Sequence, residues 1–277
     1  MVSKFQNQNE LTESISYKGS KLVFHRYGHG EKSLLLFHGF GQDHQAFKKL
    51  EEHLQEDYTI YSFDIFFHGN SQWNNGEQPL GKGFWKALLA EFINQHHIEK
   101  FSVLGFSMGG KFAFASLEAF PEKIEHIFLL APDGIKTNFW YSLATYPTAF
   151  RQLFKSMINH PERLNAVEKF AVRVGLIDKG ILRFVESQMN TPEKRERVYY
   201  AWVVFRHLKF NMKTIANIIN SNKINITLIV GKYDKIITAK NMDLLLTELV
   251  DYKFEIVETG HNGVIQESVK FLGKFSG

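Results

Sequence analysis

A serine lies between two glycines in a segment that joins an expected strand to an expected helix. It follows the apolar run 101–104 and has the sequence Gly105-Phe106-Ser107-Met108-Gly109. Side chains two residues before and after the serine would collide with the neighbouring strand and helix, so glycine at both places permits a sharp turn. The free N–H groups of the helix then point at the serine. The pattern predicts that Ser107 is a nucleophile.

Two further side chains suited to acid–base chemistry come later in the sequence. Asp234 follows one expected strand and His261 follows the next. A serine hydroxyl is a poor nucleophile until a base removes its proton; histidine titrates near neutrality and can do so. A carboxylate holds the imidazole in the required tautomer. Because the ends of parallel strands meet at one edge of a sheet, we expect Ser107, Asp234 and His261 to form a catalytic triad.

Other polar residues have competing interpretations. Asp133 also follows an expected strand and is the alternative acid, although the spacing Gly231-x-x-Asp234 favours Asp234. His38 is expected to pack and to form hydrogen bonds, and Asp64 to order the loop after it. His96 and its neighbour His97 point in different directions on a helix, so we expect no metal site there.

Apolar runs and helical patterns alternate over most of the chain. A hairpin is expected around Gly19, buried strands are expected at 33–37 and 124–130, and further strands are expected at 58–64, 101–104, 225–230 and 253–257. Helices are expected after Gly110 and at 45–54, 82–97, 239–249 and 263–275. This order predicts an α/β protein with one mostly parallel sheet and helices on both faces.

Residues 135–221 interrupt the alternation, because they contain no convincing strand. Helices are expected there at 138–158, 161–174, 179–189, 192–208 and 212–219. The segment is rich in aromatic and basic residues, and a minority of them should line a pocket. We expect three of them to bind substrate: Trp140, Phe150 and Trp202. The predicted domains are a core of 1–134 and 222–277 and a helical cap of 135–221.

Composition excludes several classes of protein. The 277 residues, 44% of them hydrophobic, suffice for one large domain with an insertion. The net charge of +4 is spread out and no basic groove motif occurs, so we expect no nucleic-acid partner. The absence of cysteine excludes disulfides, a cysteine nucleophile and thiolate metal sites. With a polar N-terminus and no run of about 20 apolar residues, we expect a soluble cytoplasmic protein without a membrane span.

Together these features resemble the α/β-hydrolase superfamily over nearly the whole chain. The resemblance rests on four motifs: His38-Gly39 after the third strand, the turn at Ser107, Gly231-x-x-Asp234, and Gly260-His261. It implies an α/β-hydrolase fold with a mostly parallel eight-stranded sheet and a helical cap inserted after the sixth strand. It also implies an oxyanion hole formed by the backbone N–H groups of Phe40 and Met108.

Two positions are informative when compared with family members. Many capped members carry a loop sequence that resembles D-x-x-G-H-G-x-S. In this chain the loop begins at Asp64 and Phe67 replaces the first glycine, so a different local turn is expected. Haloalkane dehalogenases and epoxide hydrolases of this superfamily carry aspartate at the position of the nucleophile. Ser107 argues against both activities.

The sequence therefore predicts a serine hydrolase that acts on an ester, a thioester or a similar activated acyl bond of a small molecule. It would form an acyl-enzyme and would need neither a metal nor an organic cofactor. Carbon–carbon bond hydrolysis or a cofactor-free elimination by the same triad is an alternative, and a cap arginine facing the pocket would favour it. A small-molecule receptor on the same fold is a further alternative. The oligomeric state stays open.

Overall fold

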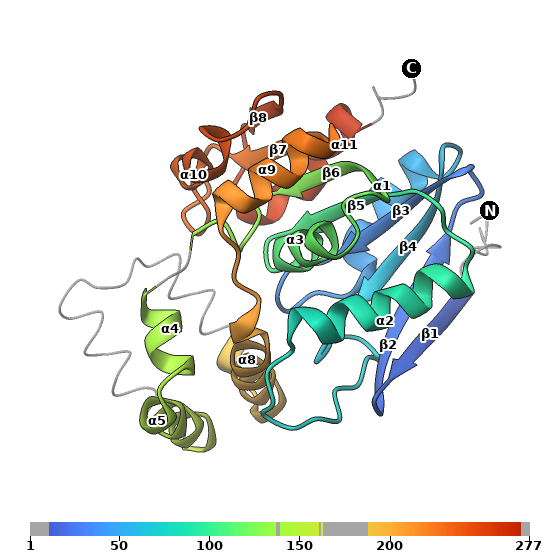
Figure 1. The fold of residues 1–277 in the computed structure, drawn as a ribbon. Helices are drawn as coiled ribbons and strands as arrows, with labels where there is room; N and C mark the ends of the chain where they lie inside the picture. Colours follow the sequence, from blue (N-terminus) through green and yellow to red (C-terminus); the bar gives the residue numbers. More distant parts are fainter. Residues whose placement is uncertain (1–10, 137–138, 161, 163–187, 273–277) are drawn as a thin grey trace, which may run out of the picture.

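A single eight-stranded sheet runs through the part of the chain that the computed structural model describes, residues 11–136, 139–160, 162 and 188–272 (Figure 1). The strands follow one another across the sheet in the order β1-β2-β4-β3-β5-β6-β7-β8. Their bounds are β1 Leu11–Tyr17, β2 Ser20–Tyr27, β3 Lys32–Phe37, β4 Tyr58–Asp64, β5 Phe101–Phe106, β6 Ile124–Leu130, β7 Asn225–Gly231 and β8 Lys253–Val257.

Six of these strands are parallel. The strands β1 and β2 form an antiparallel hairpin, and β2 is also antiparallel to β4, whereas β4, β3, β5, β6, β7 and β8 are parallel to one another. The prediction of a mostly parallel sheet is confirmed. The carboxyl ends of β3 and of β5 to β8 therefore open onto the same edge, where ligand sites of such sheets form.

Helices cover both faces of the sheet (Figure 1). On one face, α3 packs against β5 and against its neighbours α2 and α9; on the other, α1 packs against α11. Their bounds are α1 Lys48–Leu54, α2 Lys82–Gln95, α3 Gly109–Ala119, α9 Met212–Asn222 and α11 Val264–Leu272. Shorter helices are η1 His44–Phe47, η2 Phe205–His207, η3 Ala239–Met242, α10 Asp243–Leu246 and η4 His261–Gly263.

The core between the sheet and α2–α3 is aromatic. Phe37, Trp85 and Phe112 are fully buried and form edge or tilted ring contacts with centroids 5.0 to 6.1 Å apart. The indole N–H of Trp85 donates to Ser116 Oγ at 3.0 Å, so this buried polar group is satisfied. Large rings with few rotatable bonds hold α3, and with it the turn at its start, at a defined place on the sheet.

Three helices between β6 and β7 lie at the carboxyl edge of the sheet (Figure 1). They are α4 Phe139–Thr145, α5 Thr148–Asn159 and α8 Pro192–Val204. Phe154 and Ile158 of α5 pack on Val198, Tyr199 and Val203 of α8 in a hydrophobic cluster separate from the main core. The helices α5 and α8 therefore bury apolar side chains against each other, while Ala201 and Val204 of α8 join the main core.

The helical segment differs from the expected one in two places, and two of its expected helices are not tested. The single helix expected at 138–158 is two helices, because Pro147 has extended backbone and begins α5, and a residue before proline avoids helical angles. The helices expected at 161–174 and 179–189 lie almost entirely outside the described residues. The helix α9 was expected in the cap, yet its buried residues Met212, Ile215 and Ile219 belong to the main core, and it packs on α3.

Another difference concerns residues 239–249. A helix was expected along this whole stretch, but η3 is followed by the single turn α10, which ends at Leu246.

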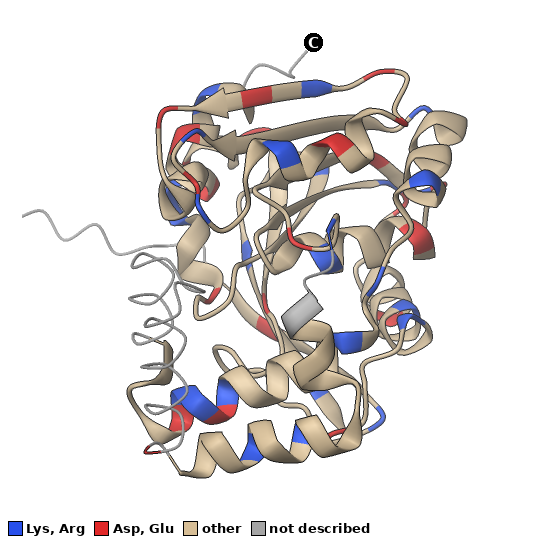
Figure 2. Ribbon diagram, turned by 90° about the vertical axis from the view of Figure 1, so that its left-hand side faces the viewer, with Lys and Arg blue, Asp and Glu red and all other residues tan. Residues whose placement is uncertain are grey.

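Basic and acidic residues are interspersed over the described ribbon (Figure 2). Within those residues, none of the helices combines the length and the apolar character needed to cross a membrane.

Candidate active site

Ser107 stands at the turn between β5 and α3 with a strained backbone. Its φ is +50°, in the left-handed region that non-glycine residues seldom adopt. Its N–H donates to the Leu130 carbonyl at 3.0 Å, and its own carbonyl accepts from the N–H groups of Gly110 and Asp133 at 2.9 and 2.8 Å. These bonds hold the serine in a conformation that it would not adopt alone.

The two glycines of the turn are required by close backbone approaches. A Cβ at Gly105 would lie 2.6 Å from the Gly109 carbonyl oxygen, and one at Gly109 would lie 1.9 Å from the Phe37 carbonyl oxygen. Neither distance is possible for real atoms. The glycine spacing recognised in the sequence therefore reflects direct contact between α3 and the strands β5 and β3.

The three residues expected to form a triad are brought together. Ser107 Oγ lies 2.9 Å from His261 Nε2, and His261 Nδ1 lies 2.6 Å from Asp234 Oδ2. With Nδ1 protonated, His261 donates to the carboxylate and its free Nε2 accepts from the serine hydroxyl. The imidazole is also packed on the ring of Phe106, with centroids 5.0 Å apart. This arrangement can remove the serine proton and return it to a leaving group.

Asp234 is oriented by its own loop. Its Oδ1 accepts from the N–H groups of Ile236 and Ile237 at 2.8 and 2.9 Å, which leaves Oδ2 for His261. The side chain is fully buried. At the start of this loop, a Cβ at Gly231 would lie 2.5 Å from the Thr259 carbonyl oxygen. The ends of β7 and β8 are therefore close enough to place the acid beside the histidine.

Asp133, the alternative acid, forms an ion pair with a different residue. Its Oδ2 is 3.0 Å from Lys111 Nζ, and its Oδ1 accepts from the N–H of Gly134 at 2.7 Å. Burial by itself lowers the pKa of Lys111, but Asp133 and Tyr141 outweigh burial and raise it, so the ammonium stays charged. The hydrogen bonds thus favour Asp234 as the partner of His261.

The loop after β3 supplies the other expected part of the site. Phe40 and Met108 line the same cavity as Ser107. On either side of Phe40, the N–H of Gly39 donates to Gln42 Oε1 at 3.0 Å and the N–H of Gly41 donates to His68 Nε2 at 2.9 Å. The loop backbone around Phe40 is therefore held at two points, as preorganised oxyanion donors require.

Two buried histidines hold this loop in their neutral form. His38 Nδ1 donates to the Gly39 carbonyl at 2.7 Å and its Nε2 accepts from the Ile65 N–H at 3.0 Å. Burial lowers the pKa of His38 to about 4. Burial also lowers the pKa of His68, which donates to the Phe66 carbonyl. His38 packs and forms hydrogen bonds as expected, whereas the sequence did not predict that His68 would position this loop.

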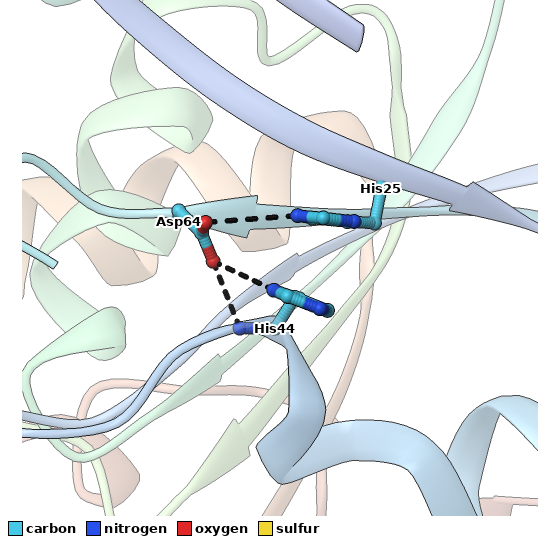
Figure 3. Close-up of side chains that lie close together, drawn as sticks. All are labelled: His25, His44 and Asp64. Carbon is cyan, nitrogen blue, oxygen red and sulfur yellow. Dashed lines mark hydrogen bonds and ion pairs between the residues drawn. The ribbon is translucent and has the colours of Figure 1, made fainter. Parts of the chain in front are cut away.

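A second cluster of titratable side chains adjoins this loop: His25 from β2, His44 from η1, and Asp64 at the end of β4 (Figure 3). Asp64 Oδ1 accepts from the N–H and the Nδ1 of His44, both at 3.0 Å, and Oδ2 accepts from the Asn70 N–H at 3.1 Å. Burial alone raises the pKa of Asp64, but its hydrogen bonds to His25, His44 and Asn70 outweigh this and lower it. Asp64 thus ties the loop that follows it to η1.

The cluster has donor atoms suited to a metal, but its ring geometry does not fit one. The rings of His25 and His44 stack with centroids 3.3 Å apart and planes 15° from parallel. A metal ion bonds to an imidazole nitrogen in the plane of the ring, and two stacked rings offer no common point in both planes. We therefore interpret this cluster as an anchor for the loops around the site.

Phe67 takes a backbone conformation usual for glycine. Its φ is +70°, so the turn accommodates phenylalanine without the different backbone that the sequence suggested. Its ring stacks on Tyr200 and contacts Phe205, with centroids 5.8 Å away in both pairs. The side chain thus joins the loop after β4 to the helical segment.

A cavity of about 530 Å³ lies over Ser107. Its described walls include residues of the sheet edge and the helical segment, among them Phe40, Met108, Ile236, Phe154, Val198, Trp202 and His261. Most of these side chains are apolar, as expected of a site that binds a small molecule.

The residues expected to bind substrate differ in position. Trp202 lines the cavity. Phe150 is 45% exposed, and Phe154, one turn further along α5, lines the cavity instead. The side chain of Trp140 lies outside the described residues. Phe150 and Phe154 are four residues apart and therefore lie on the same side of α5. The sequence alone did not distinguish which of them lines the cavity.

Known proteins resemble the chain in sequence. A family model described as alpha/beta hydrolase fold matches residues 32–268. A Mycoplasma pneumoniae protein named "Putative esterase/lipase 2" is 29% identical over 153 residues, which are 53% of this chain and 55% of that protein. Its Mycoplasma genitalium namesake is 25% identical over 60% of each chain. The matched regions thus span little more than half the length of these curated relatives.

Solved structures resemble the fold over nearly the full length. An esterase from Thermogutta terrifontis has a TM-score of 0.70 at 17% identity and covers 95% of this chain and 96% of its own. A meta-cleavage product hydrolase from Pseudomonas fluorescens has a TM-score of 0.63 at 17% identity, with 94% of each chain covered. Since the family model matches most of the sequence and the sheet has the same architecture, the chain belongs to the α/β-hydrolase fold family.

Proposed function

We propose that this protein is a serine hydrolase that cleaves an ester or another activated acyl bond of a small molecule. The observation that carries the proposal is the continuous hydrogen-bonded chain from Ser107 Oγ through His261 to Asp234, with distances of 2.9 and 2.6 Å. Relatives named as esterases or lipases support it.

The proposed reaction begins when His261 Nε2 takes the proton of Ser107 and Oγ attacks the acyl carbon. The developing oxyanion would be stabilised by the N–H groups of Phe40 and Met108. His261 then protonates the leaving group, and an acyl-enzyme remains on Ser107. Water activated by His261 releases the acid, while Asp234 stabilises the imidazolium at both stages.

Hydrolysis assays test this directly. We expect turnover of 4-nitrophenyl esters of graded chain length or of acyl-CoA thioesters, and covalent labelling of Ser107 by a fluorophosphonate. Ser107→Ala should abolish both, with the labelled residue identified by mass spectrometry. Labelling of a different residue, or none in folded protein, would contradict the proposal.

The helical segment is proposed to set substrate choice. We infer that it ends before α9, because α9 packs with the core, and that Trp202 and Phe154 contact the non-reacting part of the substrate. Phe154→Ala should shift the preferred acyl length, by up to about 1–3 kcal/mol in relative kcat/KM per methylene. Phe150→Ala, on the same helix, is the matched comparison because its ring is 45% exposed.

A further inference from the structure

The cavity over Ser107 has an uneven distribution of charge. Its described walls carry three lysines, Lys111, Lys136 and Lys209, and one carboxylate near them, Asp133. Lys111 pairs with Asp133 at 3.0 Å, so that these two charges compensate each other. Lys136 and Lys209 form no ion pair within the described part of the chain. The cavity therefore keeps an excess of positive charge.

Two of these lysines lie beside tyrosine rings of the helical segment. Lys111 Nζ lies 4.5 Å from the ring centre of Tyr141 in α4, and Lys209 Nζ lies 3.9 Å from the ring centre of Tyr146, which follows α4. Lys136 belongs to the loop after β6 that begins with Asp133. The positive charges of the cavity walls thus come from α3, from the loop after β6 and from the residues after η2, whereas Phe154 and Val198 contribute apolar walls.

A neighbouring histidine reports the same positive field. The ring of His207 stacks on Tyr146 with centroids 5.9 Å apart, next to Lys209. Its pKa is lowered, first by burial and then by the charges of Arg206 and Lys209. Charges that line a cleft with apolar walls act more strongly on a ligand than the same charges on an open surface.

We propose that the substrate carries an anionic group, a carboxylate or a phosphate, that binds between Lys136 and Lys209 while its acyl bond lies at Ser107. This rests on the proposed hydrolase function. The two lysines are the available cations, because Lys111 is already neutralised by Asp133. An anion there gains charge-assisted hydrogen bonds without breaking an existing ion pair.

Two matched pairs of esters test the anion site. One places a carboxylate on the acyl side: the 4-nitrophenyl monoester of adipic acid against 4-nitrophenyl hexanoate. The other places it on the alcohol side: 4-acetoxybenzoate against its methyl ester. The parent should prefer the anionic member of at least one pair in kcat/KM. Lys136→Gln and Lys209→Gln should each reduce that ratio by roughly 3- to 30-fold, as expected for one charged hydrogen bond.

Lys49→Gln is the control, since it makes the same charge change at an exposed position of α1 outside the cavity walls and should leave the ratio as in the parent. Equal kcat/KM within both pairs, or a preference that survives in the Lys136→Gln/Lys209→Gln double variant, would overturn the anion site. Fluorophosphonate labelling of Ser107 keeps the two proposals apart: labelling without anion preference removes only the anion site, and no labelling removes both.

Discussion

Lys111 and Asp133 form an ion pair of 3.0 Å one helical turn beyond Ser107. This pair gives Asp133 a partner of its own and separates it from His261, whose Nδ1 lies 2.6 Å from Asp234. Two aspartates that follow neighbouring strands, β6 and β7, are thereby given different partners. The two aspartates differ in that Asp133 pairs with Lys111 on α3.

The first prediction concerns the two aspartates. Asp234→Asn should lower kcat by about 10³–10⁴-fold, because an amide in place of the carboxylate favours the wrong histidine tautomer. Asp133→Asn should lower kcat less than tenfold. Steady-state hydrolysis of the best 4-nitrophenyl ester measures both, with folding checked by circular dichroism. The reverse ranking would assign the acid to Asp133.

The second prediction concerns acid stability. The pKa of His38 is about 4 in the folded protein against an ordinary 6.5, so the unfolded chain binds more protons between these values. Stability contributed by neutral His38 is therefore present above pH 6.5 and is lost as the pH falls towards 4, by about 3 kcal/mol in total. Urea unfolding at a series of pH values measures this.

His38→Gln should reduce that dependence on pH, whereas His29→Gln, at a histidine with a 63% exposed side chain, should keep the parent slope. The comparison uses slopes, since loss of the His38 hydrogen bonds lowers stability at every pH. Parallel curves for the parent and His38→Gln would show that His38 does not titrate as stated.

The third prediction concerns the backbone of Phe67, at φ +70°. Phe67→Gly loses the ring contacts with Tyr200 and Phe205 but removes the strain. Phe67→Ala loses the same contacts and keeps the strain. The glycine variant should therefore be more stable than the alanine variant by about 1 kcal/mol in the free energy of unfolding. If alanine proves equal or better in urea unfolding, the left-handed conformation at this position is not required.

The fourth prediction concerns Glu77, which joins the loop before α2 to the helical segment. Its Oε1 lies 2.6 Å from Lys155 Nζ, its Oε2 lies 3.7 Å from Arg151 Nε, and its carbonyl accepts from Arg206 at 3.3 Å. These charges are partly exposed, so the pair with Lys155 contributes only about 0.2–1 kcal/mol. Glu77→Gln should speed limited proteolysis between α4 and α8 by about 1.5- to 5-fold.

The same contact should respond to pH. Burial raises the pKa of Glu77, but the hydrogen bond from Lys155 outweighs it, and the pKa is lowered below its ordinary 4.5. The contact is thus fully present above pH 4.5 and is lost as the pH falls through the lowered pKa. Glu196→Gln on α8, at an exposed glutamate, serves as control; cleavage rates equal to those of Glu77→Gln would show that the Glu77 contact does not hold the segment.

Much of the fold could be predicted because local signals agreed with the tertiary structure. The strands 58–64 and 225–231 are short, largely apolar runs, and burial between helices leaves them little alternative. The approach of α3 to Phe37 that forces glycine at Gly109 also made Ser107 recognisable. Ser107, Asp234 and His261 could be selected as candidates because each of them follows an expected strand.

What could not be predicted depends on contacts between distant segments. The strain of the left-handed backbone at Phe67 is offset by ring contacts with Tyr200 and Phe205 of the helical segment. No local sequence pattern reveals these contacts. The place of Lys111 depends on Asp133, 22 residues later in the sequence. Likewise, His68 positions the loop after β3 by accepting a hydrogen bond from the N–H of Gly41. Nothing in the sequence around His68 indicates this contact.

The direct pairing of β6 with β7, in register from His126↔Asn225 to Leu130↔Ile229, has a consequence for how such a protein can diversify. Whereas α9 packs in the core, the residues between β6 and α9 supply no strand to the sheet in the described parts. Their length and composition can therefore change without shifting any backbone pairing in the sheet. Exchange of this segment between homologues is a route to new selectivity, in evolution or by grafting, that leaves the reacting residues where they are.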